Sequence, residues 1–212
     1  MKFFALVLSS LLLASCGGGD TQIVAATPVK SLNAIFPHPV RNASTVTGSA
    51  EIAIHTYQAI YGKAPSYRQL SDFRNQIETR GGSVWANAMA EPLNGMSDSD
   101  FSTLILNNIS VTPTSLTSTL LFGGSRKAYD DLQAACAVYM NAVGVANRGT
   151  VAAQLAEIIS NLENDTEFGV YGTAATLFNK QVSANLDYST NAANAVASVV
   201  VPPAFETPPS PI

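Results

Sequence analysis

Apolar residues recur every three or four positions through the middle of the chain, the spacing of one face of an α-helix. Eight such segments begin near residues 48, 66, 83, 97, 112, 125, 150 and 173. Outside them, the β-branched residues form no alternating run except the short Val199-Val200-Val201. This pattern predicts an all-α body, a compact bundle of seven or eight short helices spanning residues 49–190.

Local stop and start residues divide these segments. Gly62 and Pro65 are expected to end the first helix, whose apolar face is Ala53, Tyr57, Ile60 and Tyr61. Ser66 with Gln69 forms a capping box that starts the next helix. The further starts are assigned to Ser83, Ser97 with Asp100, Thr112-Pro113, Ser125, Thr150 and Thr173. The last helix is expected to run from about Thr173 through Leu177, Phe178, Val182 and Leu186.

The chain begins with a short apolar segment, residues 3–14, that follows Lys2 and runs into Leu13-Ala14-Ser15-Cys16. These features predict a secretory signal peptide over residues 1–15, too short to stay as a spanning helix. Leu-Ala-Ser-Cys also resembles the lipobox of bacterial lipoproteins. The resemblance implies that cleavage leaves Cys16 as the first residue, acylated with chains such as palmitate that hold the protein on a membrane. The alternative is an ordinary signal peptide with a chance cysteine.

The segments that flank the helical body have a different composition. Residues 16–48 hold the lipidated cysteine and a stretch rich in Gly, Thr, Ser, Asn and Pro, which predicts a flexible tether. Residues 191–212 form a tail with five of the 11 prolines, which cannot continue a helix. Gly17 rather than Asp follows the cysteine, and similarity to lipoprotein sorting in enteric bacteria favours the outer membrane.

Charge narrows the range of partners. The chain has 11 Lys and Arg against 15 Asp and Glu, and removal of residues 1–15 takes Lys2, which leaves a net charge of about −5. Because no basic stripe exists, nucleic-acid binding has no electrostatic support. Charged residues make up only 12% of the chain, about half the usual share. Such a surface of small uncharged polar groups suits an extracellular protein that packs against proteins or glycans.

Two stretches resemble a known domain. Tyr57 to Pro65, followed by Leu70 and Phe73, is similar to a motif of an uncharacterised helical domain found in bacterial surface-layer proteins and haemolysin-type calcium-binding exoproteins. Leu177 to Val182, with Leu186-Asp187-Tyr188, looks like the pattern that closes such domains. The resemblance implies a non-catalytic helical module at the cell surface, with a surface-layer protein or polysaccharide as partner. The chain departs from that family because it lacks the calcium-binding glycine repeats.

Few residues offer chemistry beyond packing. His55 lies one residue off the apolar stripe and is expected at the surface or its boundary, and neither it nor His38 has a ligand at zinc spacing. Cys136 falls on the apolar side of a helix, as a buried thiol would. The acidic groups Asp98 with Asp100, and Glu163 with Asp165 and Glu167, are explained by helix ends, with metal binding as the alternative. We expect no metal site and no cofactor.

Aromatic residues gather in the first half of the chain. Core packing explains most of them. The alternative is that Tyr61, Tyr67 and Trp85 line a cleft for sugar rings, since aromatic faces with polar tips suit carbohydrates.

These observations predict a lipid-anchored cell-envelope protein with a structural or attachment role and no catalytic activity. A lipoprotein that binds a glycan or another small ligand is the alternative. A hydrolase is a third reading, and it would need a pocket that unites His55 with a serine and an acid.

Overall fold

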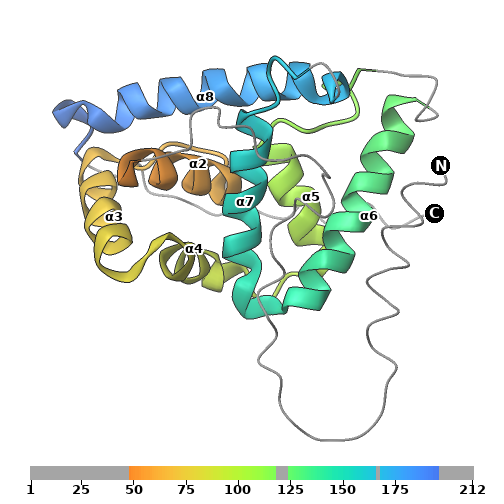
Figure 1. Ribbon diagram of the computed structural model, residues 1–212. Helices are drawn as coiled ribbons and strands as arrows, with labels where there is room; N and C mark the ends of the chain where they lie inside the picture. The colour runs from red at the N-terminus through yellow and green to blue at the C-terminus, as the bar shows by residue number, and fades with distance from the viewer. Residues whose placement is uncertain (1–47, 118–123, 166–167, 196–212) are drawn as a thin grey trace, which may run out of the picture.

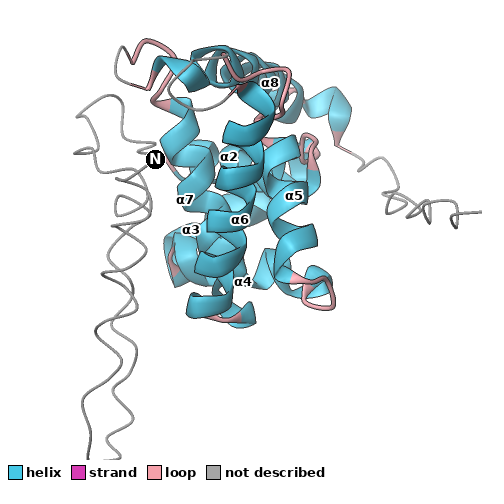
Figure 2. Ribbon diagram, turned by 90° about the vertical axis from the view of Figure 1, so that its right-hand side faces the viewer, coloured by secondary structure: helices cyan, strands magenta, loops and turns pink. Residues whose placement is uncertain are grey.

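The computed structural model describes residues 48–117, 124–165 and 168–195, which form a bundle of short helices (Figure 1). Cys16, the expected signal peptide and tether through residue 47, and the tail from residue 196 lie outside the described residues. The helices are α2 (Ser49–Tyr61), α3 (Tyr67–Arg80), α4 (Gly82–Ala90), α5 (Asp98–Asn108), α6 (Ser125–Val143), α7 (Arg148–Ser160) and α8 (Gly172–Thr190). No strand occurs in these ranges (Figure 2), so the all-α prediction is confirmed with seven α-helices in the described part.

Helix α2 is the centre of the bundle, since it packs against α3, α4, α5, α7 and α8. Figure 1 shows α8 lying along one side of the bundle next to α2, α7 crossing the middle, and α6 at the far edge. Two apolar clusters fill the interior. Ala59 and Ile60 join the larger one with α5, α6, α7 and α8, whereas Ala53, Ile54 and Tyr57 join the smaller one with α3 and α4.

The first helical hairpin forms as local sequence rules require. Gly62 ends α2 in the left-handed conformation, with φ of 67°, which glycine adopts without strain. A side chain there would also strike Asn108, because a Cβ would lie 2.7 Å from its Oδ1. Ser66 Oγ then accepts from the Gln69 N–H while Gln69 Oε1 accepts from the Ser66 N–H. The predicted capping box is therefore confirmed, and it starts α3.

A partly buried polar network holds α8 against α2. Gln58 donates to the carbonyl oxygen of Asn108 at 3.0 Å and to Gln181 Oε1 at 3.2 Å, and it accepts from Asn185 at 2.6 Å. Ser110 also donates to Gln181. Because each polar group of Gln58 has a partner, its burial is compensated, and the network fixes the position of α8.

Several predicted helix starts are wrong. No helix begins at Thr112-Pro113: a turn forms instead, because the Ser115 hydroxyl donates to the carbonyl oxygen of Ser110 and accepts from the Thr112 N–H. Leu120 and Leu121, expected on that helix, lie outside the described residues. Ser83 and Thr150 do not cap, since α4 starts at Gly82 and α7 at Arg148.

The apolar residues of α8 do not all face the core. Phe178 is fully buried, and Val182 and Leu186 pack against the core clusters. Leu177 is 44% exposed.

Candidate functional site

Helices α2, α4 and α7 enclose a cleft of about 270 Å³. Its lining residues are Ile52, His55, Thr56, Gly82, Ser83, Thr150, Ala153, Gln154 and Glu157. Six of these nine residues carry polar side chains, so the cleft differs from the apolar interior around it. It is the candidate functional site of the described body.

The cleft depends on a close crossing of α4 and α7. At Gly149 a Cβ would lie only 2.0 Å from the carbonyl oxygen of Ala86, so only glycine allows the two backbones to approach this closely. One residue further on, Asn87 Oδ1 accepts from the Thr150 N–H at 2.8 Å and from its hydroxyl at 3.1 Å. These contacts fix α7 beside α4. Thr150, Gln154 and Glu157 then follow one face of α7 along the cleft, at helical spacing.

His55 forms part of the α2 wall. Its ring stands edge-on to Phe178, with centroids 5.5 Å apart, and its Nδ1 is buried without a hydrogen-bond partner. Burial disfavours the charged imidazolium and lowers the pKa of His55 from 6.5 to about 4. The residue is therefore neutral near pH 7. The half-buried position agrees with the boundary position expected from the sequence.

Several other polar side chains of the cleft make no hydrogen bond within the described residues. The structure gives the side chains of Ser83, Gln154 and Glu157 no hydrogen-bond partner within the described residues, and the same holds for the Thr56 hydroxyl. Thr56 is only 1% exposed, whereas Ser83 is exposed and the other two are half-buried. In addition, α4 has no side-chain cap, and its first two residues, Gly82 and Ser83, line this end of the cleft.

The cleft brings together His55, Ser83 and Glu157, the residue types of a hydrolytic triad, but not in a triad's arrangement. No hydrogen bond links the three among the described residues. Nδ1 of His55, which an acid would have to bind if Nε2 served the nucleophile, is buried without a partner. A pKa of about 4 also makes His55 a poor general base at neutral pH. The geometry is better suited to binding than to nucleophilic catalysis.

The structure does not assemble the aromatic cleft considered from the sequence. Trp85 is 1% exposed and packs on Phe73 with ring centroids 5.2 Å apart, so its face is closed to a sugar. Tyr61 donates its hydroxyl to the carbonyl oxygen of Met89 at 2.6 Å, and Tyr67 is 42% exposed on the first turn of α3. Core packing prevails at Trp85 because burial of so large an apolar surface is strongly favourable.

Sequence reasoning missed a partly buried ion pair between α5 and α7. Arg148 is 5% exposed, and it donates to Asp98 Oδ1 through Nε at 3.1 Å and through Nη2 at 2.5 Å. Its guanidinium also binds the carbonyl oxygen of Met96 and lies over the Phe101 ring. Partial burial opposes ionisation of Asp98, but the hydrogen bonds from Arg148 and Asn141 prevail and lower its pKa. This contact joins two helices that are far apart in the sequence, so no pattern of neighbouring residues predicts it.

Glu163 and Asp165 make contacts within the body, whereas His38 and Glu167 lie outside the described residues. Glu163 accepts from Asn179 at 2.8 Å, and Asp165 accepts from the Phe168 N–H at 2.9 Å. No group of three or more His, Cys, Asp or Glu side chains is placed to hold a metal ion in the described ranges. Cys136 is fully buried as predicted, and desolvation raises its thiol pKa to about 12.

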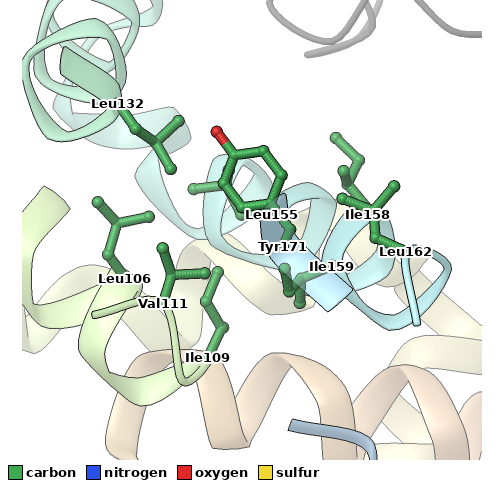
Figure 3. A pocket seen from close by; sticks show the side chains of 9 residues that line it. All are labelled: Leu106, Ile109, Val111, Leu132, Leu155, Ile158, Ile159, Leu162 and Tyr171. Carbon is green, nitrogen blue, oxygen red and sulfur yellow. The ribbon is translucent and has the colours of Figure 1, made fainter. Parts of the chain in front are cut away.

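A second cavity lies among α5, α6 and α7 (Figure 3). Its walls are entirely apolar apart from the Tyr171 ring, with Leu106 and Leu132 on one side and Leu155 and Ile159 on the other. Its volume is about 10 Å³, at the lower limit for one water molecule, and a water there would find few polar partners. We interpret it as a packing defect rather than a binding site.

Within the described residues, no helix is both long enough and apolar enough to span a membrane. A scan against models of known protein families found no match. Searches of curated proteins and of solved structures found no match either.

Proposed function

We propose that this protein is a lipid-anchored component of the cell envelope that attaches surface material without catalysing a reaction. Acyl chains on Cys16 would hold it on a membrane, which we propose to be the outer membrane. Residues 17–48 would then hold the helical body away from the bilayer. A surface-layer protein or a surface polysaccharide would be the partner.

The sequence Leu13-Ala14-Ser15-Cys16 is the observation that carries this proposal. A lipobox at the end of a short apolar segment gives an acylated protein a membrane location, and two or three acyl chains suffice for stable anchoring. The low share of charged residues also suits a protein that packs against other macromolecules outside the cytoplasm.

The described body supports a binding role over a catalytic one. Its ion pair Asp98–Arg148 and its Gln58 network join helices to each other. In the cleft, His55 is neutral and has no partner that would orient it for proton transfer. The polar cleft itself favours the second candidate function, a lipoprotein that binds a small ligand.

A retention assay tests the attachment role. Cells that lack the protein should release more surface-layer protein or polysaccharide into the medium than wild-type cells. Wild-type protein should restore retention, whereas Cys16→Ser should not. Cys136→Ala is the matched control, because it removes the other cysteine of the chain while leaving the lipobox intact, and it should restore retention. Equal release from cells with and without the protein would contradict the attachment role.

A further inference from the structure

We propose that the cleft between α2, α4 and α7 binds one neutral, hydroxyl-rich ring, the chemistry of a single sugar residue. The ring could be a free monosaccharide or the end of a longer glycan. This inference rests on the proposed attachment role and extends it, because a sugar site would let the helical body bind a surface polysaccharide directly.

The strongest indication is a hydroxyl of the cleft wall that the protein does not use. Thr56 lines the cleft and is 1% exposed, yet its hydroxyl has no hydrogen-bond partner within the described residues. Its oxygen is not among the fully buried polar atoms without a partner, so the little exposure that Thr56 keeps includes this oxygen, which a water or a ligand can reach. Because Thr56 belongs to the cleft wall, a molecule in the cleft is the natural partner.

The free groups of the cleft offer donors and acceptors together. Ser83 supplies a hydroxyl, Gln154 both an amide N–H and a carbonyl oxygen, and Glu157 two acceptor oxygens. Each sugar hydroxyl can donate and accept at once, so a polyhydroxylated ring can satisfy this mixed set.

Charge and size narrow the class of ligand further. Glu157 is the only charged residue in the lining, since His55 is neutral near pH 7, and its negative charge disfavours phosphates and carboxylates. The volume of about 270 Å³ lies just below the range of about 300–1,000 Å³ that is typical for drug-sized ligands. Ile52 and Ala153 provide an apolar patch for the C–H face of a ring.

Saturation-transfer NMR on the purified protein tests the inference. The protein is kept in detergent with its native N-terminus, so the result does not depend on whether Cys16 carries lipid. The probes are glucose, galactose, mannose and N-acetylglucosamine, together with oligosaccharides of each. Inorganic phosphate and ethylamine serve as charged comparisons. We expect transfer to at least one neutral sugar, and a preference for its oligosaccharide would indicate a glycan end.

Two variants test whether the sugar binds in the cleft. Thr56→Val removes the unpaired hydroxyl and should weaken binding severalfold without lowering the thermal midpoint, because it breaks no hydrogen bond within the protein. Glu157→Gln should weaken binding by about tenfold, as expected on loss of a hydrogen bond to a charged group. Glu91→Gln, at an exposed glutamate outside the cleft, is the control and should bind as wild type.

Two results would overturn the sugar site. One is no transfer to any sugar, or transfer only to phosphate or ethylamine. The other is sugar binding that both cleft variants leave unchanged. Neither result depends on retention of surface material, so the cleft and the anchored attachment role are tested separately.

Discussion

The replacement of Gly149 by alanine tests the packing that builds the cleft. In the structure, a Cβ at this position would lie 2.0 Å from the carbonyl oxygen of Ala86, 2.3 Å from its carbonyl carbon and 2.6 Å from the Asn87 nitrogen. All three are backbone atoms of α4, so no side-chain rotation can relieve the clash. Helix α7 would have to move away from α4 by about 1.5 Å to restore ordinary contacts of about 3.5 Å.

The expected cost follows from two opposing effects. Overpacking of a close-packed interior costs about 1–3 kcal/mol, and we take the upper end because a helix backbone must shift. Alanine is the better helix former by about 1 kcal/mol, which offsets part of this cost. The net loss is about 2 kcal/mol in the free energy of unfolding. At about 2–4 °C per kcal/mol for a chain of this size, the midpoint should fall by about 4–8 °C.

Thermal unfolding followed by far-ultraviolet circular dichroism measures this effect. The matched control is Gly95→Ala, since a Cβ at Gly95 would meet nothing within 4 Å. We expect Gly95→Ala to unfold within about 2 °C of wild type, the shift for a surface change of about 0.5 kcal/mol. An unchanged or higher midpoint for Gly149→Ala would mean that the clash costs no more than the roughly 1 kcal/mol that helix propensity contributes, and the close crossing of α4 and α7 would then be refuted.

Three further predictions concern ionisable groups. Asp98→Asn should cost about 3 kcal/mol because it leaves the buried Arg148 charge unpaired. In urea unfolding, its gap to wild type should be full above the ordinary carboxyl pKa of 3.8 and should narrow as the pH falls through the lowered pKa of Asp98 in the folded state; a constant gap would contradict the ion pair. The pKa of His55 is lower in the folded state, so the unfolded chain binds the extra proton. Wild-type stability should therefore fall by roughly 2–3 kcal/mol between pH 6.5 and 4, and His55→Gln should flatten that slope if His55 causes it. Cys136, with its pKa of about 12, should react with a thiol reagent only after denaturation, and reaction in the native protein would show that the thiol is accessible.

The sequence predicted the features that depend on residues close together in the chain. The capping box of Ser66 and Gln69 needs only a three-residue spacing, and it forms as predicted. The pairs Arg126–Asp130 and Lys127–Asp131 lie one helical turn apart on α6, so they too depend only on residues close together in the chain. The apolar periodicity also depends on residues close together in the chain, and it predicted the all-α body.

Competition between local bonds explains the false helix at Thr112-Pro113. Proline at a first helical position is favourable, but Ser115 uses its hydroxyl to bind the backbone of Ser110 and Thr112 and closes a turn instead. Serine and threonine offer both outcomes, and the sequence alone does not decide between them.

The candidate site could not be predicted, because its members come together only through tertiary packing. Thr56, Ser83 and Glu157 lie on three different helices. The close approach that joins two of those helices depends on Gly149, which in the sequence is one glycine among 14. Trp85 shows the opposite case: its aromatic face suggested a ligand, but the packing of α3 against α4 buries it.

The mass of the mature N-terminal peptide tests the central claim most directly. Protein purified from membranes is digested, and the peptide that begins at Cys16 is identified by mass spectrometry. We predict a chain that lacks residues 1–15 and carries a diacylglyceryl group on the Cys16 sulfur. An unmodified Cys16, or cleavage at another position, would contradict the lipid anchor and the attachment role that rests on it.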